Sequence, residues 1–151
     1  MRNLLTLLLA SLATACTSSR PPEHLDRHDQ RQGRWNTYYD EARTQLLTRG
    51  RYRHGQPVGR WRYYTLAGAV QRRERYRRHG YSDITYYYPG GQVARQGQAR
   101  VVEEPDGPHF YWLGEWNYYS LAGALDSVQT YDLGKRQRTR YLTAERVRRA
   151  K

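Results

Sequence analysis

The chain has 151 residues, enough for one small domain, and is strongly basic: 26 Lys and Arg stand against 14 Asp and Glu, a formal net charge of +12. Its single cysteine excludes an internal disulfide. Charge of this sign favours anionic partners such as phosphate head groups, acidic glycans or an acidic protein, although arginine excess from a GC-rich genome would give the same count.

Residues 1–15 are typical of an export signal, with Arg2, then a leucine-rich stretch too short to span a bilayer. The small residues Ala13 to Ala15 precede Cys16, which resembles the lipobox of bacterial lipoproteins, although that family usually has Leu where Ala13 stands. The resemblance implies a membrane-anchored lipoprotein with covalent lipid on Cys16, and Thr17 implies the outer membrane in a Gram-negative host. Cleavage after Ala15 without lipid is the alternative.

Residues 16–32 are polar and include two adjacent prolines, which predicts a flexible tether. His24 and His28 stand beside two aspartates and offer metal-ligand chemistry. Such pairs arise by chance in a solvated linker, so we predict no metal site.

From Gly33 onward the chain repeats the pattern G-x-W-x-Y-Y-x-x-x-G-x-V/L. Two copies, over residues 59–70 and 114–125, are complete; a third, over 82–93, has Ile84 in place of tryptophan, and the first has two extra residues in its loop. A tyrosine usually follows six residues after the Val or Leu that ends the motif, and Ala99 is the exception. The predicted structural residues of the repeat are Gly33, Trp35, Gly59, Trp61, Tyr63, Gly68, Tyr86, Gly91, Gly114, Trp116, Tyr118 and Gly123.

Each unit has the pattern of a β-hairpin. Aromatics alternate with a charge in residues 61–63, as in a half-buried strand, and Gly68 suits a tight loop. The return strand over residues 70–76 places Arg72 and Glu74 on one face, where we expect them to pair. Residues 101–112 look like an additional or an elongated hairpin.

A single hairpin is marginal, but four in line can share one aromatic layer. We therefore predict an all-β fold: repeated antiparallel β-hairpins in an elongated, single-layer twisted sheet over residues 33–136. Residues 137–151 are expected to form a basic cap or tail, with helical spacing over residues 143–151.

The repeat resembles the MORN repeat, and more closely the bacterial variant gathered under the YwqK family, often labelled as toxin–antitoxin antitoxins. The resemblance covers about residues 33–136 and implies a sheet of successive hairpins. The family label implies an inhibitory partner of a toxin protein, which is our alternative function. That label implies a cytoplasmic partner, whereas the export signal implies the cell envelope.

Catalytic signatures are missing from the sequence: it contains no nucleophile elbow, P-loop, dinucleotide fingerprint or zinc spacing. Glu104 and His109 offer an acid/base pair, but the adjoining prolines and glycine indicate a solvated turn. We predict no enzyme activity and no cofactor besides the lipid.

The second tyrosine of each pair is predicted to face away from the tryptophan and to lie among arginines. Such a face suits protein, glycan or lipid-head-group binding, although aromatics on both faces would also stabilise a thin sheet. The candidate binding residues are Arg62, Tyr64, Arg73, Arg75, Tyr87 and Tyr119, with Arg77 and Arg78 beside them. The predicted function is a membrane-anchored, non-catalytic module that binds an envelope protein or an anionic glycan or lipid surface, with no nucleic-acid partner.

Overall fold

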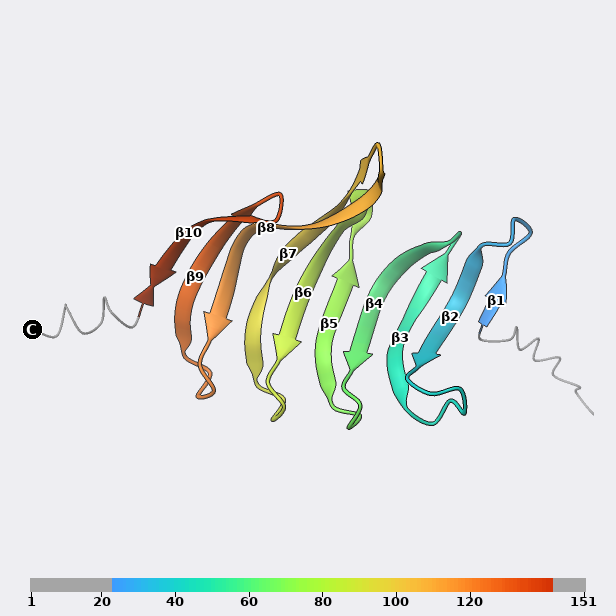
Figure 1. The fold of residues 1–151 in the computed structure, drawn as a ribbon, viewed down its shortest axis with the longest axis horizontal. Coiled ribbons are helices and arrows are strands. Elements are labelled where there is room, and N and C mark those ends of the chain that lie inside the picture. Colours follow the sequence, from blue (N-terminus) through green and yellow to red (C-terminus); the bar gives the residue numbers. More distant parts are fainter. Residues whose placement is uncertain (1–22, 143–151) are drawn as a thin grey trace, which may run out of the picture.

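The structure, a computed structural model, describes residues 23–142, in which ten strands form one open antiparallel sheet (Figure 1). Every strand pairs with the next one in the chain, so the sheet is a run of hairpins without crossovers. The strands are β1 (Glu23–Leu25), β2 (Arg31–Tyr38), β3 (Leu46–Arg53), β4 (Gln56–Tyr64), β5 (Val70–Tyr76), β6 (Tyr81–Tyr87), β7 (Val93–Glu104), β8 (Gly107–Tyr119), β9 (Leu125–Asp132) and β10 (Lys135–Tyr141). A 3₁₀ turn (Arg78–Gly80) joins β5 to β6.

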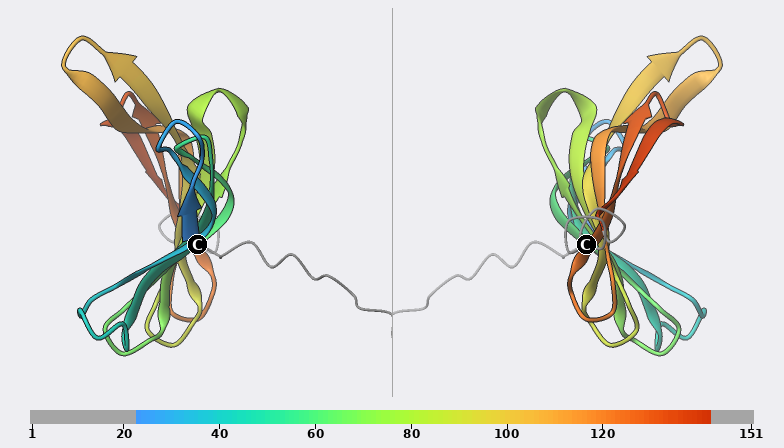
Figure 2. Two further views of the ribbon diagram at one scale, coloured as in Figure 1. Left: turned by 90° about the vertical axis from the view of Figure 1, so that its right-hand side faces the viewer. Right: turned by 90° about the vertical axis from the view of Figure 1, so that its left-hand side faces the viewer.

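The sheet is a single layer with a strong twist. Viewed along its long axis, its strands and hairpins fan out around a narrow waist (Figure 2). The prediction of an all-β fold made of repeated antiparallel hairpins is confirmed.

The sheet extends beyond the predicted limits at both ends. The tether predicted for residues 16–32 is wrong from Glu23 onward, because β1 pairs with β2 and the Glu23 carboxylate accepts the backbone N–H of Asn36 at 3.0 Å. The tail predicted from residue 137 is likewise wrong up to Tyr141, since β10 pairs with β9. The predicted helix at 143–151 and the lipid site Cys16 lie outside the described residues.

The repeat glycines take backbone conformations that other residues rarely adopt. Gly59 and Gly114 precede the buried tryptophans of their strands with φ of +67° and +63°. Gly68 and Gly123 close the loops with φ of +80° and +79°. Left-handed backbone is strained for residues with a Cβ, which explains why glycine recurs there in the sequence.

The core lies on one face of the sheet, which we call the aromatic face. Trp61, Ile84 and Trp116 are buried there, and all three stand at the tryptophan position of the repeat. Tyr52 and Tyr76 pack edge-on against Trp61, with ring centroids 4.9 and 6.2 Å away. An open sheet has no second layer to cover it, so these large rings bury one another.

Each buried tryptophan lies over a glycine of the preceding unit. A Cβ on Gly50 would overlap the Trp61 indole, and a Cβ on Gly97 would overlap the Trp116 indole. Glu74 occupies the position equivalent to Gly50 and Gly97, and the residue that faces it on the next strand is Ile84. The replacement of tryptophan by isoleucine in the third copy is therefore matched by a larger neighbour.

Residues 101–112 form the outer half of one elongated hairpin, made by β7 and β8, which rises above the rest of the sheet (Figure 1). Trp112 of this hairpin stacks on Trp116 with ring centroids 3.8 Å apart and pairs across the strands with Ala99. Ala99 is fully buried. A tyrosine is not needed at position 99 because Trp112 fills the space above it.

None of the helical segments within residues 23–142 has the length and apolar character that crossing a bilayer requires.

Candidate functional site: the arginine face

Arginines gather on the face of the sheet opposite the tryptophans. Period-2 alternation along β2 to β5, together with the strand register, places eight of them on this face. Seven of the eight line the hollows described below, whereas Arg53, at the end of β3, does not. All seven are exposed. We call this set the arginine face: Arg34, Arg49, Arg51, Arg60, Arg62, Arg73 and Arg75.

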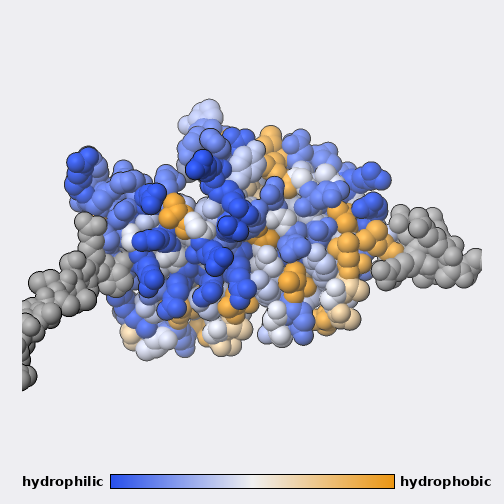
Figure 3. Space-filling model, turned by 180° about the vertical axis from the view of Figure 1, so that it is seen from behind, coloured by the Kyte–Doolittle hydropathy of each residue, from blue (hydrophilic) through white to orange (hydrophobic). Residues whose placement is uncertain are grey.

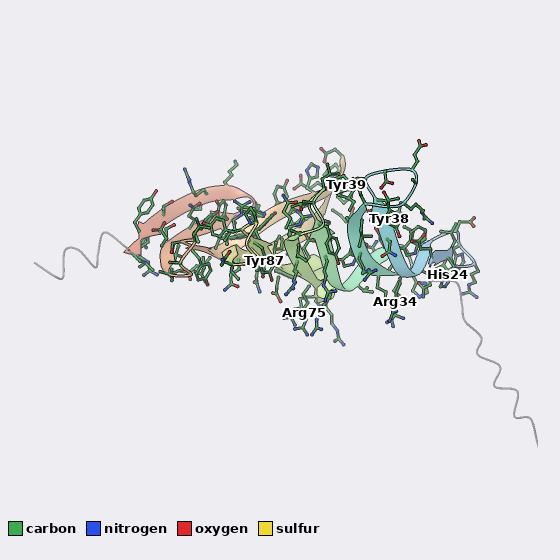
Figure 4. All side chains as sticks on the ribbon, turned by 90° about the horizontal axis from the view of Figure 1, so that it is seen from below. His24, Arg34, Tyr38, Tyr39, Arg75 and Tyr87 are labelled. Atoms are coloured by element: carbon green, nitrogen blue, oxygen red, sulfur yellow. The ribbon has the colours of Figure 1, made fainter. Side chains whose placement is uncertain are left out.

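The figures locate this face directly. Arg34 and Arg75 project from the same side of the ribbon, whereas Tyr38 and Tyr39 lie toward the other side (Figure 4). Seen from behind, the middle of the molecule carries a broad hydrophilic area (Figure 3).

The register sets these arginines opposite one another. Arg62 of β4 faces Arg49 on β3 and Arg73 on β5, which gives a row of three across neighbouring strands. Arg60 likewise faces Arg75. Like charges directly opposite each other destabilise a sheet, so the arrangement does not serve the fold itself.

Acids do not balance this charge. Within residues 23–142, the structure pairs none of the seven arginines with a carboxylate; the arginines that form ion pairs there are Arg43, Arg72 and Arg77. Asp83, the acid at the border of the face, binds Arg77 at 2.6 Å. Arg77, one of the candidate binding residues, thus differs from the seven in having an acidic partner, and its role in binding stays a prediction.

The arginines on the aromatic face have a different environment. Across the sheet Tyr63, Arg72, Tyr86 and Arg95 face one another in sequence. The Arg72 guanidinium lies 3.8 Å from the Tyr63 ring centroid, and that of Arg95 lies 4.3 Å from the Tyr86 centroid. These two arginines are held by rings, as expected for structural residues. A uniform excess of arginine does not account for this difference between the faces.

The arginine face is hollowed rather than flat. One hollow of about 860 Å³ lies over β2 to β4, and an adjoining one of about 330 Å³ lies over β4 to β6. Arg60 and Arg62 line both. A ligand in the hollows would therefore meet guanidinium groups from several strands at once.

The predicted binding residues divide into two groups. Arg62, Arg73 and Arg75 lie on the arginine face, and Tyr87 joins them, with its ring centroid 5.1 Å from the Arg73 guanidinium. Tyr119 does not: it lies among later strands, where its hydroxyl accepts a hydrogen bond from Gln96 at 2.8 Å.

Tyr64 ends β4 next to the loop, and its carbonyl accepts the Tyr39 hydroxyl at 2.8 Å. Arg78 lies in the 3₁₀ turn. Sequence reasoning missed four arginines of the face, although their alternation with other residues along β2, β3 and β4 was a usable signal: Arg34, Arg49, Arg51 and Arg60.

Glu74 is the buried acid of the aromatic face. Its carboxylate accepts hydrogen bonds from the hydroxyls of Tyr63 at 2.9 Å and Tyr76 at 2.8 Å, and pairs with Arg72 Nε at 3.1 Å, which confirms the predicted Arg72–Glu74 contact. Burial and then the Glu74 charge raise the pKa of Tyr63 to about 12. The Glu74 carboxylate thus accepts both hydroxyls and pairs with the Arg72 guanidinium inside the fold, so the cluster serves structure.

A second titratable cluster lies at the tip of the β7–β8 hairpin. His109 Nε2 is 2.8 Å from Asp106 Oδ1 and 4.0 Å from Glu104 Oε2, so the nearer carboxylate is Asp106 and not Glu104, the residue that the sequence offered as an acid/base partner. The Tyr111 hydroxyl donates to Glu104 at 2.9 Å, which raises the pKa of that tyrosine. The cluster is largely exposed, as expected for a solvated turn.

The histidines near the N-terminal edge make a separate arrangement. Asp26 binds His54 at 3.0 Å and accepts the backbone N–H of His28, and these hydrogen bonds lower the pKa of Asp26 to about 2. In the part of the chain that the structure describes, the only three residues whose potential ligand atoms lie close together are Glu104, Asp106 and His109. His24 and His28 are not among them.

No protein-family profile, curated protein or solved structure matches the chain. The resemblance to MORN repeats therefore stays a prediction, and function has to be argued from the arginine face.

Proposed function

We propose that this chain is a non-catalytic binding module whose arginine face binds an anionic partner of the cell envelope, an acidic glycan, lipid head group or protein. The observation that supports it is a field of seven exposed arginines without an ion pair to an acid among residues 23–142.

The chemistry of arginine favours this kind of partner. A guanidinium group presents several N–H donors in a fixed plane, which match the oxygens of a phosphate, sulfate or carboxylate in pairs. Arg49, Arg62 and Arg73 stand on adjacent strands, which lie about 4.8 Å apart. A polymer or surface with closely spaced negative groups would engage all three together.

The proposed lipid on Cys16 would hold this face near a membrane. Cys16 lies seven positions before Glu23, the first residue of the sheet, and a fully extended chain of that length reaches at most about 25 Å. The proposed place is the outer membrane of a Gram-negative envelope, where anionic glycans and head groups are present and nucleic acid is not a normal partner.

Retention on a column of heparin, a sulfated polysaccharide, tests the arginine face. We compare Arg62→Gln/Arg73→Gln with the control Arg138→Gln/Arg140→Gln, which removes the same charge from exposed positions on β10. The Arg62/Arg73 variant should elute at clearly lower salt than the control, because it removes two members of one cluster. If both variants elute at the same salt concentration, net charge alone explains binding and the proposal fails.

A further inference from the structure

We propose that one long edge of the sheet inserts into the surface of a lipid bilayer, so that the sheet stands upright on the membrane. This edge carries the loops that follow β2, β4, β6 and β8. The loop after β2 contains Asp40, Glu41 and Arg43 and is not part of the proposed contact, and we call the other three loops the uncharged edge: residues 65–69, 88–92 and 120–124. The proposal rests on these loops and not on the function proposed for the arginine face.

The composition of these loops is unusual for this chain. Their 15 residues include no Asp, Glu, Lys or Arg, although 26% of the whole chain is charged. Loops at the opposite edge carry charge, for example at Asp26, Arg78 and Asp106. Figure 3 shows white and orange atoms along the lower border of the molecule, below the hydrophilic middle.

Two of the loops present a leucine at the tip. Leu66 is 63% exposed and Leu121 is 67% exposed, at the same position of two repeats. Gly68 and Gly123, with positive φ, supply the backbone conformation of these turns, so the loops do not need the leucines for their own geometry. An apolar residue left in water at a repeated position indicates a partner that removes it from water.

Backbone N–H groups of these loops form hydrogen bonds within the loops, which suits them to a water-poor environment. In the first loop, Thr65 N–H donates to Ala69 O at 2.8 Å and Gly68 N–H to Thr65 O at 2.9 Å. The same two bonds recur in the third loop, from Ser120 to Ala124 and from Gly123 to Ser120. Because these N–H groups are bonded within the loop, entering a lipid interface does not leave them without acceptors.

Apolar, aromatic and basic residues follow one another from the loop tips into the sheet, as they do across the interface of a membrane protein. Tyr64 comes directly before the first loop, and tyrosine is favoured at the level of the head groups. Arg62 and Arg73 lie two residues higher, about 7 Å from the strand end. A head-group layer is about 5–7 Å thick, so these arginines would meet phosphates when Leu66 reaches the acyl chains.

A bilayer fits this edge better than a protein does. A stable protein interface needs a continuous complementary patch of about 800 Å² on each partner. The uncharged edge offers separate tips along a line, with the loop at residues 88–92 between the two leucines. A fluid surface accepts such tips without a matching shape.

Site-specific dye labelling of the full chain tests the proposal. Cys16→Ser removes the only cysteine, and an environment-sensitive dye is then placed through Leu66→Cys, Leu121→Cys or the control Leu133→Cys. Leu133 is 52% exposed but lies in the β9–β10 turn, at the opposite edge. The labelled chains are mixed with phosphatidylcholine–phosphatidylglycerol vesicles and the vesicle-bound fraction is isolated by flotation, so that only the orientation of bound chains is compared; absence of any bound fraction would also overturn the proposal.

At high salt, the probes at Leu66 and Leu121 should shift their emission to the blue and be quenched by nitroxide-labelled lipid, while the probe at Leu133 stays water-like. Equal emission at both edges would overturn the proposal, and so would a blue shift that grows with protein concentration without vesicles, since that assigns the edge to contact between copies. Retention on heparin is measured separately, so failure of the arginine face and failure of the uncharged edge are distinguishable.

Discussion

Glu74 demonstrates how a charged residue is accommodated in a sheet that has a single layer. The residue is 4% exposed, and its carboxylate accepts two tyrosine hydroxyls and pairs with one guanidinium, so its charge is compensated within the fold. The same residue occupies the position that glycine holds in neighbouring units, which excludes a tryptophan from the next strand and leaves room for Ile84. One residue thus changes both the electrostatics and the packing of its unit.

The tyrosines around Glu74 make stability depend on alkaline pH. Burial raises the pKa of Tyr63 from 10.0 to about 12 and also raises the pKa of Tyr76, so the folded chain holds these protons more tightly than the unfolded chain. This contribution to stability is full below about pH 10 and is lost as pH rises through about 12. Urea midpoints measured from pH 8 to 12 should fall over that window.

Glu74→Gln provides the comparison. It removes the second cause of the raised pKa of Tyr63 but leaves burial, the larger one, in place. The loss of stability with rising pH should therefore be smaller in this variant, though still present. Identical pH profiles in the two proteins would contradict the assignment.

At the scale of elements, the packing of one hairpin on the next explains both irregular copies of the repeat. Trp112 on the elongated β7–β8 hairpin covers Ala99, and Glu74 on β5 faces Ile84 on β6. In the two regular contacts a flat indole lies on a bare glycine backbone. The strand pairs thus alternate large against small, which keeps the aromatic face close-packed.

Gly97→Ala tests this packing between strands. The added Cβ would overlap the Trp116 ring, and overpacking of this kind costs about 1–3 kcal/mol in free energy of unfolding. Gly90→Ala is the control, because the nearest atoms there belong to the flexible end of Gln92 and φ is not positive. Chemical denaturation should give a large loss for the first and little change for the second.

A second substitution makes this prediction sharper. Trp116→Ile reproduces the smaller residue found at Ile84, so Gly97→Ala should be less destabilising in that background than in the parent. Equal effects in both backgrounds would show that the two residues are not coupled.

At the scale of the whole molecule, the sheet carries three surfaces of different character: an aromatic face that holds the fold, an arginine face, and the uncharged edge. The first has its charges satisfied by rings and hydroxyls, whereas the second keeps seven exposed arginines. Both proposals concern surfaces that the fold does not need for its own stability. They predict a module held upright on a membrane with its basic face open to anionic partners.

The lipid proposed for Cys16 would supply most of the membrane affinity. Acyl chains anchor far more strongly than two leucine tips and screened arginines, which give only reversible binding. In cells, Cys16→Ser should therefore release the protein from washed membranes at high salt, while the parent stays bound. Fractionation followed by immunoblotting measures this, and retention of the variant after the wash would contradict lipid anchoring.

The repeating hairpin, its glycines and the face on which each strand residue lies can be predicted from the sequence, because period-2 alternation is a property of the chain alone. The placement of Arg62 on the face away from Trp61, and of Trp61 at a buried position, followed from that alternation. Which residues of separate units contact one another is known from the folded sheet and not from the repeat pattern. The register between hairpins set Arg49 opposite Arg62 and laid Trp112 over Ala99, and it brought β1 into a segment predicted as tether. Such contacts depend on bulges and on distant strands, which the local pattern of a single chain does not encode.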